Sequence, residues 1–193
     1  MRGLFVFIAM VFCHAFLQAQ PVEAGSYIML QGPIEVTHET YGFDGTTLTD
    51  TLDFPASGIR LESVSRYDAE FSPVSYALQL FRGSGEVPVQ EVNVSFIDTA
   101  AVWSTHSELG DSTGVTRLER PYVFMQNLVF AQLAVVLLKY DHARGGAQSL
   151  TVWMPDQALA LSLEIEFTSA TTGAVDVAGT TMHVEVDCNR TLI

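Results

Sequence analysis

The sequence predicts a mainly β fold, either an antiparallel β-barrel or a β-sandwich, with one short helix around residues 120–134. Three observations support this prediction. Several short segments alternate apolar and polar residues with a period of two, which is typical of strands that have one buried and one solvated face. Clusters of Gly, Asp, Ser and Pro separate these segments at regular intervals and predict turns. A single segment instead places its apolar residues at helical spacing.

The first residues predict a cleavable signal peptide over residues 1–24. Arg2 precedes an apolar or small run from Leu4 to Phe12, and small residues suited to cleavage follow. We expect the cut after Ala24, with a cut after Ala19 as the alternative. The apolar run is shorter than the roughly 18–20 residues that span a bilayer, so no stable membrane span is expected after cleavage. The sequence therefore predicts an exported protein, secreted or periplasmic.

Residues 25–193 predict a single β-rich domain, because no linker or change in composition divides them. Nine Lys or Arg residues stand against 22 Asp or Glu residues, giving a net charge of −13. Nucleic acids and anionic membranes are poor partners for such a surface. Once the signal peptide is removed, Cys188 is the only cysteine, so no intramolecular disulfide is expected.

The strands are predicted from alternation. In residues 182–188, Met182, Val184 and Val186 fall on one face and His183 and Glu185 on the other. We expect Leu133–Tyr140 to form a strand that pairs with Ser149–Met154 across a turn at residues 142–146. The expected strands are, in chain order, residues 27–30, 58–64, 76–81, 91–96, 133–140, 149–154, 161–168 and 182–188.

The helix is predicted between Arg120 and Ala134. Pro121 suits a first helical turn, and apolar residues then recur at helical spacing: Phe124, Leu128, Ala131 and Val135. Polar residues interrupt this segment, which favours a buried helix over a membrane span.

One strand face presents candidate metal ligands. His183, Glu185 and Asp187 alternate along one strand and therefore point to the same side, at successive spacings of about 6.8 Å. Such a row could hold a divalent cation, but zinc needs its ligands to converge within about 2.2 Å, which a flat strand achieves only with a ligand from a neighbour. The alternative interpretation is a solvated outer face on an acidic protein.

No phosphate loop or dinucleotide fingerprint occurs in the sequence, and His38, His106 and His142 are scattered. The segment 110–114 reads G-D-S-T-G and matches the spacing G-x-S-x-G, but this segment is predicted as a turn and not as a strand-to-helix elbow. We therefore expect no catalytic residue and no cofactor. Asn93 and Asn189 begin N-glycosylation acceptor triplets, which have meaning only in a eukaryotic host.

The order of features resembles the haemolysin-coregulated protein family, the tube proteins of type VI secretion. Four segments carry the resemblance: Tyr27–Gly32, Gly58–Phe71, Val89–Phe96 and Val135–Gly146. The resemblance implies a small β-barrel with one helix that stacks as hexameric rings. The signal peptide and the long segment from Ser95 to Leu118 depart from the family's pattern.

The leading functional hypothesis is a secreted, non-enzymatic interaction or assembly protein that binds a protein partner or itself. The alternative is a secreted carbohydrate- or cation-dependent binding module, or a hydrolase, that uses the face of His183, Glu185 and Asp187.

Overall fold

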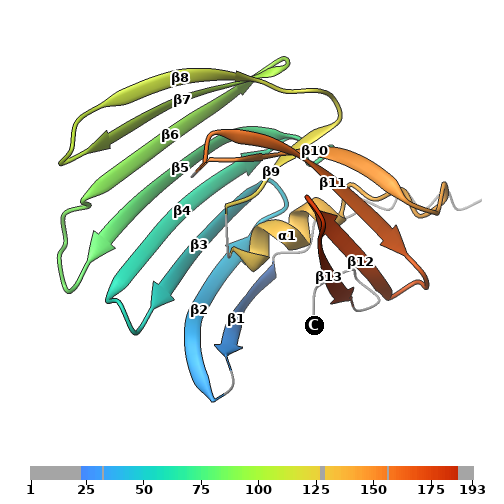
Figure 1. The fold of residues 1–193 in the computed structure, drawn as a ribbon, viewed down its shortest axis with the longest axis horizontal. Coiled ribbons are helices and arrows are strands. Elements are labelled where there is room, and N and C mark those ends of the chain that lie inside the picture. Colours follow the sequence, from blue (N-terminus) through green and yellow to red (C-terminus); the bar gives the residue numbers. More distant parts are fainter. Residues whose placement is uncertain (1–22, 32, 127–128, 156, 187–193) are drawn as a thin grey trace, which may run out of the picture.

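The chain folds into two β-sheets with one short helix between them (Figure 1). A computed structural model describes residues 23–31, 33–126, 129–155 and 157–186. Strands make up most of these residues, and no closed barrel forms, because each sheet has two outermost strands. The predicted mainly β fold with a single short helix is confirmed.

The first sheet is an eight-stranded antiparallel meander in which each strand pairs with the preceding one, in the order β1 to β8. Its strands are β1 (Glu23–Gln31), β2 (Ile34–Phe43), β3 (Thr47–Phe54), β4 (Ile59–Tyr67), β5 (Pro73–Arg82), β6 (Gln90–Ile97), β7 (Ala100–Ser107) and β8 (Ser112–Arg117). Because consecutive strands run in opposite directions, the β1–β2, β3–β4, β5–β6 and β7–β8 turns lie at one end of this sheet.

The second sheet has five strands in the order β13-β12-β11-β10-β9. Its strands are β9 (Tyr122–Phe124), β10 (Gln148–Met154), β11 (Leu159–Phe167), β12 (Thr172–Val177) and β13 (Thr180–Glu185). All neighbours pair antiparallel except β9, which runs parallel to β10.

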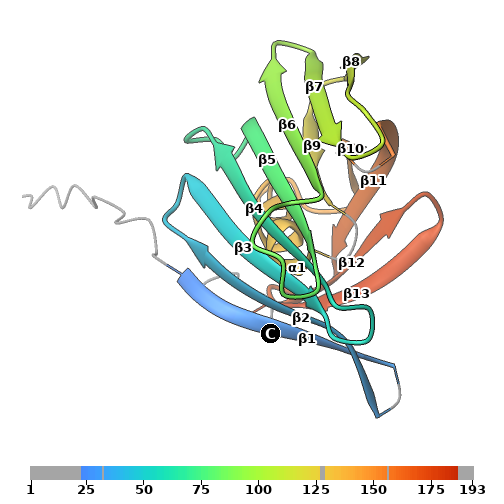
Figure 2. The same ribbon diagram turned by 90° about the vertical axis from the view of Figure 1, so that its left-hand side faces the viewer.

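Helix α1 (Phe130–Leu137) lies between the two sheets (Figure 2). Its residues Ala131 and Val135 join a buried cluster with the first sheet, whereas Leu133 and Val136 join one with the second sheet. Lys139, just beyond the helix, donates to the Glu70 carbonyl oxygen at 2.7 Å and so ties the helix end to the β4–β5 turn. The helix therefore connects both layers of the core.

The position of the helix differs from the sequence prediction. The segment that begins at Pro121 forms strand β9, and α1 begins only at Phe130. The predicted strand over Leu133–Tyr140 is wrong, because residues 133–137 are helical and β10 pairs with β9 and β11 instead. A short, continuously apolar run fits a buried strand and a buried helix equally well, so its period alone does not decide between them.

Glycines on the two outermost strands of the first sheet lie under aromatic rings. Gly25 on β1 pairs with Tyr41, and Gly114 on β8 pairs with Trp103. A Cβ atom added to Gly114 would lie 2.4 Å from the Trp103 ring, so only glycine allows the indole to cover this strand. Such aromatic cover of edge glycines fixes the register of the outer strand pairs.

The predicted signal peptide lies almost entirely outside the described residues. A cut after Ala24 would remove the first two residues of β1, whereas a cut after Ala19 would leave this strand whole. Within the described ranges, no helix is both long and apolar enough to cross a bilayer.

Candidate binding site

An apolar cavity of about 470 Å³ opens where β1 of the first sheet, helix α1 and the β12–β13 hairpin of the second sheet meet. Its lining residues are Met29, Met125, Gln126, Val129, Phe130, Leu133, Met154, Val177, Thr180 and Met182. None of these described lining residues is charged. Every methionine of the chain beyond residue 22 is among them. Methionine side chains are flexible and polarisable, so a wall built from them adapts to ligands of different shapes.

The helical wall of the cavity is held in place by a carboxylate from the first sheet. Glu39 on β2 accepts hydrogen bonds from the Phe130 N–H at 2.7 Å and the Ala131 N–H at 3.0 Å. Val129 precedes the helix and provides no side-chain cap, so Glu39 supplies the acceptor that helix N-termini require. This contact spans more than 90 residues of sequence and joins the sheet to the helix.

Burial raises the pKa of Glu39, and the two helix N–H groups oppose this shift because they stabilise the ionised form. The side chain is completely buried. Glu39 is thus a buried acid, and the groups that favour its charged form are the two N–H groups at the start of helix α1.

A second contact fixes the start of the helical wall. The Gln126 backbone N–H donates to Oε1 of Gln132, and both residues are buried. Tyr76 Oη lies 3.5 Å from Gln126 Oε1. These contacts position the segment from residue 125 that contributes Met125 to the cavity.

A polar cluster lies beneath the helix, on the inner face of the first sheet. Ser63 Oγ donates to Asp50 Oδ2 at 2.6 Å. Burial is the main cause that raises the pKa of Asp50 to about 7, with a smaller contribution from the negative charge of Glu39, while the Ser63 hydrogen bond opposes both. Among the residues that the structure describes, Asp50 Oδ1 and Gln132 Nε2 find no protein hydrogen-bond partner. Groups of this kind are usually satisfied by ordered water in a folded protein.

A larger depression of about 650 Å³ lies over the outward face of strands β2 to β6. Thr40, Thr51, Glu62, Gln79 and Glu91 form one register row across it. The Gln79 amide donates to Glu91 Oε1 at 2.9 Å, so part of its polar lining is already paired. Small-molecule sites are typically concave and mostly apolar with few polar groups. The methionine-lined cavity fits that description better than this open polar depression.

Comparison with known proteins finds a similar fold for this chain but no sequence family. No family model matches the chain, and no curated protein matches it. A solved structure of a DUF1089 family protein from Pseudomonas aeruginosa is similar, with a TM-score of 0.61 and 11% sequence identity. The similarity covers 86% of this chain and 92% of that one. At this identity the match concerns the fold alone, and the resemblance to type VI tube proteins stays a prediction.

The predicted metal ligands are only partly described. His183 and Glu185 lie on β13, are exposed and point to the same side, as predicted. Their cross-strand neighbours are Ala174 and Thr172, which offer no carboxylate or imidazole. Asp187, like Cys188 and Asn189, lies outside the described residues. Within the described part of the chain, no group of three or more His, Cys, Asp or Glu side chains could hold a metal ion.

The β7–β8 turn brings a histidine and a carboxylate into contact. His106 Nδ1 contacts Asp111 Oδ1, but both side chains are mostly exposed. The nearby Ser107 hydroxyl donates to the Gly110 carbonyl oxygen at 3.1 Å rather than to an imidazole. The G-x-S-x-G match at residues 110–114 belongs to the same turn, but its Ser112 begins strand β8 and not a helix, so it does not form the strand-to-helix elbow of hydrolases. Asn93 is exposed on the outward face of β6, as predicted.

Sequence reasoning missed the cavity because its lining comes from segments that lie up to 153 positions apart, Met29 and Met182 being the most distant. The one signal available was the spacing of Met29, Met125, Met154 and Met182, but four isolated methionines predict no shared location. Glu39 and Asp50 were missed because carboxylates on strands are usually solvated.

Proposed function

We propose that this protein is a non-enzymatic binding protein that holds an uncharged, flexible apolar ligand in the methionine-lined cavity. The observation that carries the proposal is the gathering of all four methionines beyond residue 22 around one uncharged cavity. The cavity volume of about 470 Å³ lies within the roughly 300–1,000 Å³ of small-molecule sites. Thr180 is the exposed polar residue of the lining, so a polar end of the ligand would lie at that rim.

The proposal is tested by titrating the protein with N-phenyl-1-naphthylamine, an uncharged dye that fluoresces in apolar surroundings. We expect saturable binding at one site. Thr180→Trp should weaken it at least tenfold, because the indole fills the mouth from an exposed position where a strand tolerates an aromatic residue. The matched control is His183→Trp, which adds the same side chain to the outward face of the same strand and should bind the dye as the wild type does.

Two results would contradict the proposal. The first is a wild-type protein that does not enhance the fluorescence of the dye. The second is equal binding by the Thr180→Trp and His183→Trp variants, which would place the dye elsewhere. Peroxide oxidation gives an independent test, since methionine sulfoxide is polar and should reduce dye binding.

Self-assembly is a second candidate function, favoured by the exposed edge strand β8. Within the described residues β8 pairs only with β7, and its Val115 is 66% exposed beside the 39% exposed Val102. An edge strand with exposed apolar residues is a template for pairing with another chain. This arrangement supports the ring- or tube-forming role that the tube-protein resemblance implies, which remains a proposal.

Size-exclusion chromatography with light scattering tests the assembly. We expect an oligomer at high concentration that Val115→Lys dissociates, because an edge lysine opposes strand addition. The control is Val64→Lys, which places the same charge at a 38% exposed position on the central strand β4. A wild-type monomer at every concentration would rule assembly out.

A further inference from the structure

One end of the first sheet carries exposed aliphatic residues at its turns. The turns β1–β2, β5–β6 and β7–β8 share this end, together with the β3–β4 turn (Figure 1). Leu30 and Ile34 are each 62% exposed, Val87 is 78% exposed, and Leu109 is fully exposed. The turns at the opposite end contain Asp44, Asp68 and Asp98. Both ends carry carboxylates, and we call the end with Leu30, Ile34, Val87 and Leu109 the apolar end because of these exposed aliphatic side chains.

The β1–β2 hairpin exposes aliphatic side chains on both of its faces, each opposite a polar cross-strand partner. Ile28 and Leu30 alternate with Met29 along β1, so they point away from the cavity that Met29 lines. Ile34 pairs with Gln31, which lies two residues after Met29 on β1. Ile34 is therefore on the same face of the hairpin as Met29. In Figure 2 this hairpin extends beyond the neighbouring turns of the sheet. Exposure on both faces of a projecting hairpin suits insertion into an apolar medium better than contact with a flat protein surface.

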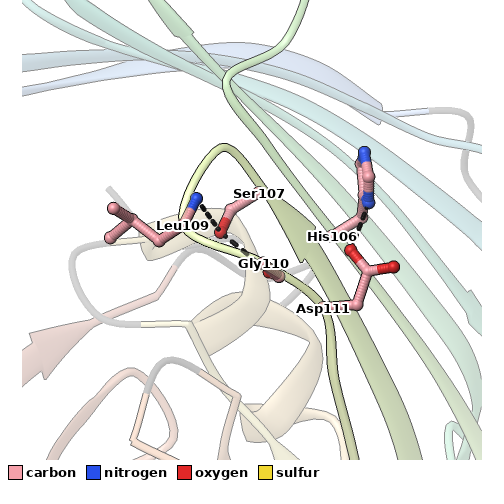
Figure 3. Close-up of polar contacts among 5 residues, drawn as sticks. All are labelled: His106, Ser107, Leu109, Gly110 and Asp111. Carbon is pink, nitrogen blue, oxygen red and sulfur yellow. Dashed lines mark hydrogen bonds and ion pairs between the residues drawn. The ribbon is translucent and has the colours of Figure 1, made fainter.

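The β7–β8 turn, at the same end of the sheet, carries the exposed Leu109. Figure 3 shows the Leu109 side chain directed away from the turn. The Leu109 N–H donates to Ser107 Oγ at 3.3 Å, and the Gly110 N–H donates to the Ser107 carbonyl oxygen at 2.9 Å. These bonds fix the turn, so the exposed leucine belongs to an ordered element.

Charge restricts the chemistry of the partner. Each of these three turns places a glutamate beside its aliphatic residue: Glu35, Glu86 and Glu108. Residues 30–35 and 107–112 include no Lys or Arg, and the β5–β6 turn has one, Arg82, at its start. A surface of this kind is repelled by anionic lipids, whereas a bilayer of zwitterionic lipids offers an apolar interior without net negative charge.

We propose that the apolar end of the first sheet, chiefly the β1–β2 hairpin, docks onto a zwitterionic lipid bilayer. The proposal rests on the proposed function in one respect: docking would place the cavity mouth, which Met29 borders, next to a source or acceptor of apolar ligands. Exposed aliphatic side chains at the bilayer surface provide the attraction, as they do for interfacial segments in general.

The test is flotation of the mature protein with phosphatidylcholine vesicles. The wild type should float with them, and the combined variant Ile28→Ser, Leu30→Ser, Ile34→Ser should bind at least about tenfold more weakly, since it removes three exposed aliphatic side chains. The matched control Val64→Ser, Val74→Ser, Ile97→Ser removes three exposed aliphatic side chains elsewhere on the same sheet and should float as the wild type does. Adding phosphatidylglycerol to the vesicles should weaken binding.

Three outcomes would overturn the docking proposal: no flotation of the wild type, equal flotation of the hairpin variant and the wild type, or flotation only with cationic vesicles. A wild-type dimer that the hairpin variant dissociates, without any lipid binding, would assign the hairpin to contact with a second copy and also overturn it. Dye binding in the absence of vesicles separates the two proposals. Retained dye binding without flotation rejects docking alone, and flotation without dye binding rejects the cavity alone.

Discussion

Replacing Glu39 by Ala should lower the free energy of unfolding by about 2–4 kcal/mol. The carboxylate accepts hydrogen bonds from the Phe130 and Ala131 N–H groups, and Ala131 is 1% exposed. Alanine would leave both donors without an acceptor, and each buried unsatisfied group costs about 1–3 kcal/mol. Removal of a desolvated carboxylate, whose pKa is raised by burial, offsets part of this loss. Urea denaturation monitored by circular dichroism measures the change.

Two further variants make this prediction specific. Glu39→Gln keeps one acceptor oxygen and should lose roughly half as much stability, because its NH₂ group faces the second N–H. Glu62→Ala removes a glutamate whose ion pair with Arg60 is solvent-exposed, and such pairs contribute about 0–1 kcal/mol. Equal unfolding curves for Glu39→Ala and Glu62→Ala would show that Glu39 does not secure the helix.

The same variant bears on the cavity. Val129, Phe130 and Leu133 form its helical wall, and Glu39 holds the first turn of that helix. We therefore expect Glu39→Ala to weaken binding of the uncharged dye even under conditions where the variant stays folded.

The strands that sequence analysis predicted are those whose alternation is simple. β6, β11 and β13 place valine, leucine or isoleucine inward and polar residues outward, so the period of two reveals them directly. β2 and β3 were not predicted, because their inward positions include Thr37, Glu39 and Asp50. Carboxylates at core positions invert the expected pattern, and only the helix and the neighbouring strands explain why they are tolerated there.

The helix is hard to predict from the sequence for a different reason. Its apolar residues are continuous from Leu133 to Leu138, so burial on all sides removes the amphipathic period that identifies surface helices. What selects the helix is a tertiary contact, the capping of its first turn by a residue more than 90 positions earlier. The cavity depends on the same long-range arrangement, and for this reason no local pattern predicts it.

Asp50 should make the protein less stable as the pH rises from about 4 to about 7. Its pKa rises from the 3.8 of an ordinary aspartate to about 7 in the folded protein, so within this window the folded state holds a proton that the unfolded state has released. Unfolding then releases a proton, and a rise in pH favours the unfolded state. Above pH 7 the contribution of Asp50 no longer changes with pH.

Asp50→Asn isolates this effect, because asparagine can still accept the hydrogen bond from Ser63 but does not ionise. We expect the variant and the wild type to be similarly stable near pH 4, and the variant to be more stable by about 2–4 kcal/mol at pH 8, since each unit of pKa shift corresponds to about 1.4 kcal/mol. Glu39, whose pKa is also raised, is present in both proteins, so its own pH dependence largely cancels in the difference.

Ser63→Ala gives the sign of the effect a second test. The serine hydroxyl donates to the Asp50 carboxylate and so lowers its pKa against the opposing effect of burial. Its removal should extend the pH-dependent loss of stability beyond pH 7, whereas Asp50→Asn should abolish that loss. Parallel curves of unfolding free energy against pH for the wild type and Asp50→Asn, measured from pH 4 to pH 8, would show that the buried carboxyl is not the titrating group. If Asp50→Asn instead extended the pH-dependent loss of stability and Ser63→Ala abolished it, Asp50 would be ionised in the folded protein and stabilised by a cation or water that binds beneath the helix.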